Sequence, residues 1–450
     1  MAAPAEARPI GPTLENLTPR AAAALVRQHI DPADTRDFLR SSPAKLAAVG
    51  IIAMILCILA GTVTALSAGE RRGGLETLLT ETEPFAASAQ QLYIELSVAD
   101  AAASTGFISG GLEPPEVRSA YLQAVGAAAT ETTGGAAGDE APGSPTRMEL
   151  AAIAARLPSY AGVVETARAD NRLGLPVGAA YLTEASNLMQ SEMLPMADQL
   201  YQQRADQVAD TLQRYDHPPW GAIILLALAM AALAFAQIYL LRNWRRVFNP
   251  GLVLASFAVL IMVLWVGAGT SIAAADTHRA LEEGATPTDM LTQARILAQQ
   301  ARSAETLKLS RRDTGGQYDQ SFDTAIGELR NVLAAYPEDA TGDDSVGDAE
   351  EHTDGWVAAH ERTNDAIARA DYTTAVNITI GPGPDDATAH FTAVDEDLER
   401  GIADSRDDLR TKVANGARAL EGVVPGALLL TPIAVLSIAI GMVPRLREYR

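Results

Sequence analysis

Four uncharged apolar runs constrain the fold of this chain more than any other feature of its sequence. They cover residues 46–69, 219–241, 251–274 and 422–444, and none of them contains Asp, Glu, Lys, Arg or His. A run of about 20 apolar residues is long enough to cross the hydrocarbon core of a bilayer as a helix. The sequence therefore predicts an integral membrane protein with four transmembrane helices held in a lipid bilayer.

The short polar segments beside these spans set the expected orientation. The loop 242–250 contains Arg242, Arg245 and Arg246, the tail 445–450 adds three arginines, and the arm 1–45 has five arginines and Lys45. Basic residues in short segments favour the cytoplasmic side. We therefore expect a multi-pass plasma-membrane protein with cytoplasmic N- and C-termini. The two long loops, residues 70–218 and 275–421, are then extracytoplasmic.

Most of the negative charge lies in the two long loops. Residues 68–217 hold 20 acidic and 9 basic side chains, and residues 275–421 hold 30 and 14, which gives formal charges of −11 and −16. This acidity argues against a nucleic-acid partner. The single cysteine, Cys57, lies in the first span, where we expect a small apolar filler rather than a lipid attachment site.

The pattern in both loops predicts antiparallel helical bundles, so the expected fold class is all-α. In the first loop, helices are expected up to Ile108, from about Pro115, through Tyr160, and from Pro176 down to Trp220, with a linker at 131–145. Apolar residues at helical spacing predict the bundle seams. The seam residues are Leu182, Ala185, Met189, Met193, Met196 and Leu200 in the first loop, and Phe391, Val394, Leu398, Ile402 and Leu409 in the second. Residues 338–351 and 381–386 are expected to be linkers in the second loop.

The order of span, long acidic loop and span occurs twice, which indicates a tandem duplication. The two copies are offset by roughly 200 residues. Within the loops, Tyr160-Ala161 and Glu165 match Trp356-Val357 and Glu361 at an offset of 196.

No catalytic or metal-binding motif is found. The sequence has no phosphate-binding loop, no nucleophile elbow and no HExxH spacing. The acidic tract at 338–351 lacks the register of a calcium loop. The spans lack the ionisable residues that ion-coupled transport usually requires. We expect no enzyme activity, no metal and no cofactor.

The stretch DNRLGLP, residues 170–176, raises three alternatives: a helical hairpin, a partner surface and a ligand pocket. Asn171, Gly174 and Pro176 are typical of a helix end followed by a helix start. We therefore expect a hairpin first, with the nearby charges on a solvated or partner-facing surface, and a pocket last. The candidate ligand- or partner-binding residues are Tyr160, Glu165, Arg168, Asn171, Arg172, Trp356 and His360.

The cytoplasmic segments are too short to hold a catalytic domain, so any output belongs to another polypeptide. The arm 1–45 contains a helical pattern that predicts either a helix lying on the membrane or a docking helix. Candidate docking residues are Arg20, Leu25, Arg27, Arg242, Arg245 and Arg246.

This layout, together with the segment LPSYAGVVETARADNRLGLPVGAAYL from Leu157 to Leu182, resembles the GlnX family of actinobacterial membrane proteins. The resemblance implies a relay between an extracytoplasmic amino-acid-binding lipoprotein and a cytoplasmic Ser/Thr kinase. The resemblance includes no motif specific enough to assign individual binding residues in this sequence. A direct amino-acid sensor of the four-helix type, a transporter-associated protein and a structural envelope protein remain alternatives.

Overall fold

Helices make up the whole of the regular structure in the computed structural model, which describes residues 42–109, 113–135, 143–244, 249–312, 316–338 and 340–447. No strand occurs in these ranges, so the predicted all-α class is confirmed. The chain divides into two compact units. We call residues 1–65, 220–266 and 425–450 the apolar unit, and residues 66–219 and 267–424 the bundle unit.

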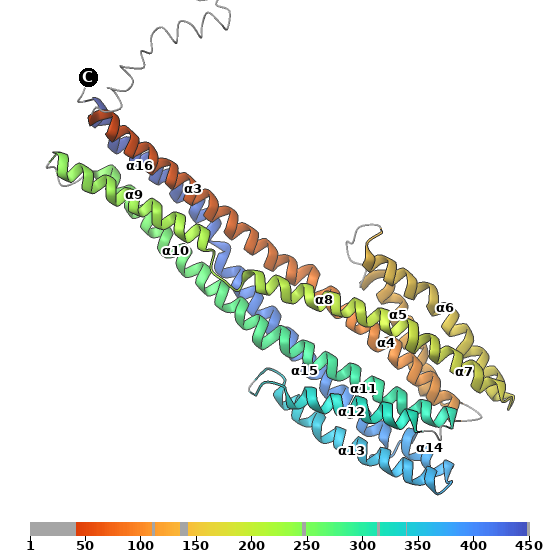
Figure 1. Cartoon of the computed structure of the whole chain (residues 1–450). Helices are drawn as coiled ribbons and strands as arrows, with labels where there is room; N and C mark the ends of the chain where they lie inside the picture. The colour runs from red at the N-terminus through yellow and green to blue at the C-terminus, as the bar shows by residue number, and fades with distance from the viewer. Residues whose placement is uncertain are drawn as a thin grey trace, which may run out of the picture. The chain divides into compact units, whose positions relative to one another are not determined.

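Four long helices supply the apolar unit: α3 (Ser42–Thr77), α9 (Trp220–Trp244), α10 (Pro250–Ala280) and α16 (Val423–Arg447) (Figure 1). Helices α3 and α10 also extend into the residues of the bundle unit. Among the described residues, four helical stretches are long and apolar enough to cross a membrane. This confirms the four predicted spans and fits a multi-pass membrane protein.

Small residues let the helices of the apolar unit approach closely. A Cβ added to Gly61 of α3 would lie 1.8 Å from Oγ1 of Thr431 on α16, and Cys57 is a buried filler, as expected. Such close crossings of small residues are typical of helices packed within lipid. Large apolar side chains instead point outward, among them Ile52, Ile55, Phe235, Phe257, Leu264 and Leu436. This pattern fits a unit whose outer surface faces the hydrocarbon of a membrane.

The bundle unit consists of two halves, which we call half one (residues 66–219) and half two (residues 267–424). Half one contains α4 (Glu83–Ile108), α5 (Pro115–Thr130), α6 (Pro145–Arg172), α7 (Val177–Leu188) and α8 (Leu194–Tyr215). Half two contains α11 (Thr286–Arg311), α12 (Gln317–Ala334), α13 (Asp343–Ala368), α14 (Tyr372–Ile380) and α15 (Ala387–Glu421). Short π-helical turns, η2 (Leu78–Thr82), η3 (Glu131–Gly135), η4 (Met189–Met193) and η5 (Leu281–Ala285), interrupt or precede them.

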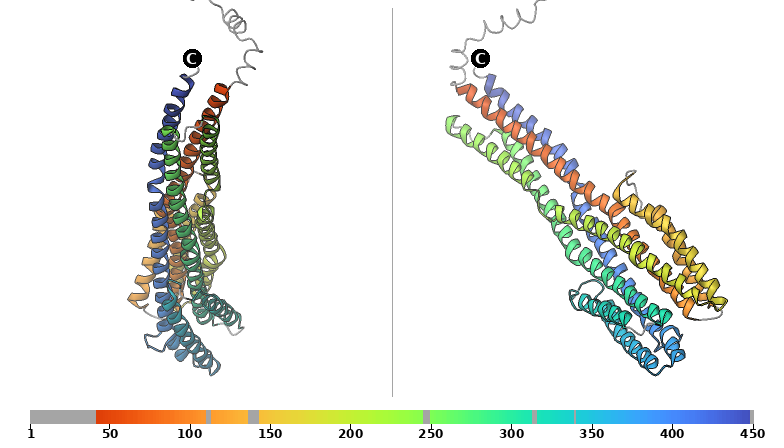
Figure 2. Two further views of the ribbon diagram at one scale, coloured as in Figure 1. Left: turned by 90° about the vertical axis from the view of Figure 1, so that its left-hand side faces the viewer. Right: turned by 45° about the vertical axis from the view of Figure 1, so that its right-hand side comes forward.

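The two halves share their central helices. Helix α4 packs against α8 and α11, and α11 packs against α15, while α5–α7 lie on the side of half one and α12–α14 on the side of half two (Figure 2). The core of half one even includes Ile296 of α11. The two long loops therefore form one unit with a continuous centre.

Both predicted seams are confirmed. Leu182, Met189, Met193 and Leu200 are buried in the core of half one, with Met196 packed against it. Val394, Leu398 and Ile402 are buried in the core of half two, with Phe391 packed against it, and Leu409 is buried as well. The spacing of three and four residues places these side chains on one face of each helix.

The structure repeats in a way that supports the duplication. Helices α4 and α11 have 26 residues each, and each follows a five-residue π-helix that begins with leucine. Helices α6 and α13 are each followed, two residues after their last residue, by a left-handed residue, Gly174 with φ 69° and Ala370 with φ 60°. Leu175 and Asp371 then donate their amide N–H groups back to the carbonyls of residues 170 and 366, which completes the same helix-ending motif.

The predicted linker at 338–351 is wrong over most of its length. Helix α13 begins at Asp343, after Gly342 with φ 103°. Asp343 and Asp344 lie in its first turn, where carboxylates interact favourably with the positive end of the helix dipole. Val346 and Ala349 are buried three residues apart, which fixes this turn on the core of half two.

Candidate functional site between the two halves

A buried carboxylate from half one meets two arginines of half two where the halves pack together. Glu83, the first residue of α4, is buried. Its Oε2 lies 2.7 Å from Nη2 of Arg410, and its Oε1 lies 3.7 Å from Nε of Arg406. A buried carboxylate needs such partners because its desolvation is costly. This contact therefore ties α4 to α15.

A second polar contact joins α8 to α11. The hydroxyl of Tyr201 donates a hydrogen bond to Oδ1 of Asp289 at 2.7 Å. Tyr201 is buried, and burial raises the pKa of its hydroxyl well above the ordinary value, with the charge of Asp289 adding to the effect. The phenol thus remains a donor throughout the physiological range.

Further hydrogen bonds between the halves follow the central helices. Gln300 donates to the hydroxyl of Tyr93 at 3.2 Å, Gln190 to Ser303 at 3.0 Å, and Arg311 to Asn187 at 3.0 Å, while Arg406 also donates to Gln90. Three of these hydrogen bonds are part-buried, and polar groups shielded from water are stable only when they are paired, so these contacts favour one register between the halves.

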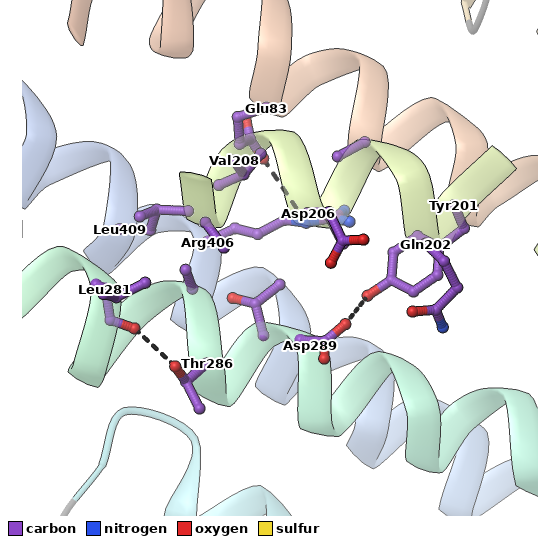
Figure 3. A pocket seen from close by; sticks show the side chains of 15 residues that line it. Glu83, Tyr201, Gln202, Asp206, Val208, Leu281, Thr286, Asp289, Arg406 and Leu409 are labelled. Atoms are coloured by element: carbon purple, nitrogen blue, oxygen red, sulfur yellow. Dashed lines mark hydrogen bonds and ion pairs between the residues drawn. The ribbon is translucent and has the colours of Figure 1, made fainter. Parts of the chain in front are cut away.

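A cavity of about 160 Å³ lies among these contacts (Figure 3). Its lining comes from both halves: Glu83, Ala86, Tyr201, Gln202, Ala205, Asp206, Val208 and Ala209 from half one, and Leu281, Ala285, Thr286, Thr288, Asp289, Arg406 and Leu409 from half two. Alanine, valine and leucine make its walls mostly apolar. Three carboxylates and one guanidinium make its polar part acidic.

The sequence prediction did not include this site. Glu83 and Arg410 are 327 positions apart, and nothing in the sequence pattern pairs them. The one available signal is the sequence Glu-Pro at the start of a bundle helix, which places Glu83 in a first helical turn.

The predicted residues of half one lie elsewhere, in α6. Tyr160 is fully buried and donates a hydrogen bond to the buried Asp100 at 3.4 Å. Ser186 and Gln190 also donate to Asp100, at 3.1 and 3.0 Å. Burial raises the pKa of Asp100 above its ordinary value, against the opposing effect of these hydrogen bonds. Tyr160 is thus placed as an internal anchor of the bundle.

The expectation of a solvated surface is wrong for Arg168. This side chain is buried, with its guanidinium carbon 4.1 Å from the centroid of the Tyr121 ring. It forms ion pairs with Glu113 at 2.9 Å and Glu165 at 2.8 Å, and Arg118 also contacts Glu165. The two neighbouring carboxylates and the aromatic face draw the guanidinium into the bundle. Glu165 itself remains exposed.

The turn between α6 and α7 exposes apolar side chains beside the remaining predicted residues. Asn171 donates a hydrogen bond to the carbonyl of Phe107 at 3.0 Å, which fixes the turn on α4, while Arg172 is exposed. Leu173, Leu175 and Val177 are 73%, 45% and 46% exposed. We call these three side chains the apolar tip. The predicted hairpin is confirmed, because α6 ends at Arg172 and α7 begins at Val177.

In half two, Trp356 and His360 surround a second buried carboxylate. Trp356 donates a hydrogen bond from Nε1 to Glu305 at 3.2 Å, and Nδ1 of His360 lies 3.4 Å from the same carboxylate. Arg302 completes the cluster at 2.7 Å. Burial would raise the pKa of Glu305, but the hydrogen bond from His360 and the charge of Arg302 outweigh it and hold this pKa below the ordinary value. Tyr160 and Trp356 therefore play the same part in the two halves.

Of the predicted cytoplasmic docking residues, Arg242 is exposed near the end of α9. Arg20, Leu25, Arg27, Arg245 and Arg246 lie outside the described residues. In the described ranges, no group of three or more His, Cys, Asp or Glu side chains is arranged to hold a metal ion.

Comparison with known proteins finds one family match, which covers part of half one. Residues 74–213 match the family described as the actinobacterial sensor domain, and this region contains α4–α7 and nearly all of α8. No curated protein and no solved structure matches the chain. The family match supports an actinobacterial sensor protein with a signalling rather than a catalytic role.

Proposed function

We propose that this protein is a non-enzymatic transmembrane sensor that recognises a ligand-loaded solute-binding protein outside the cell. It passes the signal to a cytoplasmic partner such as a Ser/Thr kinase. The proposal takes the sensor class from the family match and the relay from the resemblance to GlnX-like proteins. The proposal also assumes the orientation expected from the basic residues, in which both halves of the bundle unit lie outside the cell and the arginine-rich segments lie inside.

The apolar tip is the observation that carries the recognition of a protein. The turn between α13 and α14 has the same backbone motif, but it has Arg369, Ala370 and Asp371 where the turn between α6 and α7 has Leu173, Gly174 and Leu175. Folding of this turn therefore does not require leucine. Exposed leucines grouped at one point are typical of a protein interface, where burying each contributes roughly 1.5–3 kcal/mol.

The shared central helices support the relay. Because α4 and α7 of half one pack against α11 of half two, and α8 packs against η5, a partner that tilts α6 and α7 acts on contacts of both halves. Helix α8 is followed in the chain by α9, and α15 by α16, both of which are candidate spans. A shift in the bundle unit thus has a short path along the chain to the spans.

A matched cross-linking experiment tests the recognition step. A photoreactive amino acid is placed at Leu173 in one strain and at Arg369, its equivalent in half two, in another. We expect the label at 173 to form an adduct with a solute-binding lipoprotein, identified by mass spectrometry, and to form more of it when that protein's amino acid is supplied. Equal adducts from both positions, or no adduct from 173, would contradict the proposal.

Direct sensing of a small molecule is the second candidate function. A polar hollow of about 580 Å³ lies between α7 and the helices α11 and α12, lined mainly by amide and hydroxyl side chains, with Arg311 at its wall. The guanidinium of Arg311, which donates to Asn187, is the basic group of this lining that could pair with the carboxylate of an amino acid. Calorimetry of the full chain with glutamate, aspartate and glutamine separates the two functions, since saturable binding without a partner protein favours this second one.

A further inference from the structure

Two π-helical turns lie at equivalent places in the two halves: η2 joins α3 to α4, and η5 joins α10 to α11. At the end of η2, Glu83 donates its amide N–H to the carbonyl of Leu78, five positions earlier. At the end of η5, Thr286 donates its amide N–H to Leu281, and its Oγ1 donates to the same carbonyl at 2.9 Å (Figure 3). The chain stays helical through both turns, so each turn lies within a helical stretch of 62 residues that contains a candidate span.

A π turn contains one residue more than a regular α-helical turn accommodates. Such single turns are rare and often lie at functional sites. When a π turn tightens to an α turn, the helix on one side moves by up to one residue against the other side, which is a rotation of up to about 100° and a shift of about 1.5 Å. Because backbone hydrogen bonds are made in both forms, the packing around the turn decides which form is stable.

One stretch of α15 contacts both π turns. At η2, Arg410 binds the buried carboxylate of Glu83 at 2.7 Å, and Arg406 lies 3.7 Å from its other oxygen. Glu83 is the residue whose amide N–H closes the π turn, so turning of the chain at this point would pull its carboxylate away from both guanidinium groups. A buried carboxylate without its partners is strongly destabilised. These contacts therefore favour the π form of η2.

The contacts of α15 with η5 have the same effect. Lys412 binds Glu283 of the turn at 2.5 Å and Asp408 of its own helix at 2.5 Å. Gly284 packs directly on the backbone of α15, since an added Cβ would lie 2.9 Å from Cα of Leu409. All the residues of α15 that make these contacts with the two turns lie within residues 406–412, which we call the clamp.

We propose that η2 and η5 are the points at which α3 and α10 change register against α4 and α11, and that the clamp holds both turns in the π form. Loss of the contact of Arg410 frees η2, and loss of the contact of Lys412 frees η5. Because α15 is followed by α16, a candidate span, the clamp connects that span with the helices of two others. The use of this register change in signalling rests on the proposed sensor function, whereas the register change itself does not.

The test measures which side chains beside each turn are reachable from water. It uses the full-length protein in nanodiscs, without a partner protein and with Cys57 replaced by alanine. Single cysteines are introduced at three buried positions: Leu78→Cys at the start of η2, Ala280→Cys just before η5, and Ala89→Cys beyond η2 in α4. The rate of reaction with a membrane-impermeant maleimide reports the exposure of each.

A register step has a specific signature in this experiment. Tightening of η2 moves position 78 to the present place of Thr77, and tightening of η5 moves position 280 to the present place of Arg279. Both of these places are exposed. Position 89 lies on the other side of η2 and stays buried. General loosening of the bundle would instead expose positions 78 and 89 together.

We expect Arg410→Ala to raise the reaction rate at position 78 by about tenfold or more and to leave positions 89 and 280 within about twofold. Lys412→Ala should raise the rate at position 280 alone. Arg400→Ala, on the same helix but outside the clamp, should change none of the three. Deletion of Thr80 removes the additional residue of η2, so Arg410→Ala in that background should no longer change the rate at position 78.

Two results would overturn the proposal. One is an equal rise at positions 78 and 89 in Arg410→Ala, and the other is unchanged rates at positions 78 and 280 in both clamp variants. The two variants act on different turns, so if one of them fails to fold the other still decides. Since no partner is present, this outcome is independent of cross-linking at the apolar tip.

Discussion

Glu83 and Arg410 join the first helix of half one to the last helix of half two, with Oε2 of the carboxylate 2.7 Å from Nη2 of the guanidinium. The carboxylate is buried and the guanidinium is half exposed. Two loops that are separate in sequence are thus held in one register. The predictions below test this arrangement and the repeat that surrounds it.

The pair should show a measurable coupling between the halves. In a double-mutant cycle of Glu83→Gln and Arg410→Ala, we expect a coupling energy of about 1 kcal/mol, because water screens the exposed guanidinium but not the buried carboxylate. Thermal or denaturant unfolding of the full chain in nanodiscs gives the values. The exposed pair Arg72–Glu76 within α3 serves as the control and should couple less. A coupling energy no larger than that of the exposed control pair would contradict a stabilising contact between the halves at Glu83 and Arg410.

The buried carboxylates of Asp100 and Glu305 should respond oppositely to neutralisation. At neutral pH we expect Glu305→Gln to destabilise the protein by about 3 kcal/mol, because it leaves Arg302 without its buried partner. Among the described residues, Asp100 has hydrogen bonds but no ion pair, so Asp100→Asn should raise the unfolding midpoint. A loss of stability in both variants would contradict the assigned environments.

The contributions of Glu305 and Asp100 to stability should depend on pH in opposite directions. The folded-state pKa of Glu305 lies below its ordinary value of 4.5, so its contribution is full above that value and is lost as the pH falls through the folded pKa. The folded-state pKa of Asp100 lies above its ordinary value of 3.8. The wild type should therefore approach the stability of Asp100→Asn as the pH falls. Unfolding midpoints of the two variants measured from pH 7 to pH 4 check both trends.

The two equivalent helix ends offer an internal control for backbone strain. Gly174 and Ala370 both have positive φ, a conformation that alanine adopts at a cost of roughly 1 kcal/mol relative to glycine. We expect Gly174→Ala to destabilise the protein and Ala370→Gly to stabilise it, each by about 1 kcal/mol. Changes of the same sign in both variants would show that the two turns are not equivalent.

Two helical glycines should differ in the same experiment. A Cβ at Gly284 in η5 would lie 2.9 Å from Cα of Leu409, so the backbone of η5 or α15 must move. Gly284→Ala should cost about 1–3 kcal/mol. At Gly347 in α13, an added Cβ meets nothing within 4 Å, and alanine should stabilise the helix by about 0.5–1 kcal/mol. A neutral Gly284→Ala would mean that η5 packs less closely than described.

Local pattern predicted much of the fold. The spans followed from length and the absence of charge, and the seam through Met189 and Met193 followed from helical spacing. The turn at Gly174 followed from its residue types. The acidic tract was misread because Asp343 and Asp344 suit a helix start as well as a loop. In each of these cases the deciding interactions lie within a few residues of one another.

The candidate site could not be predicted in this way. Arg168 was expected at the surface because its partners are distant in sequence: Glu113 lies just before α5, and Tyr121 lies within α5. The contacts of Glu83 and Tyr201 depend on how the halves pack, and a single sequence contains no signal for that packing. Tyr160 and Trp356 were found from the repeat, although their burial points first to a structural role.

The most direct test of the account is the spacing between the halves in the presence and absence of the partner. Spin labels on exposed Thr166 of α6 and exposed Glu361 of α13 are introduced into the full chain with Cys57 replaced by alanine, and pulsed electron paramagnetic resonance gives their distance distribution in nanodiscs. We predict that a ligand-loaded solute-binding protein shifts this distribution, and that Leu173→Asp together with Leu175→Asp removes the shift. An unchanged distribution while the partner is bound would contradict a relay through the shared helices.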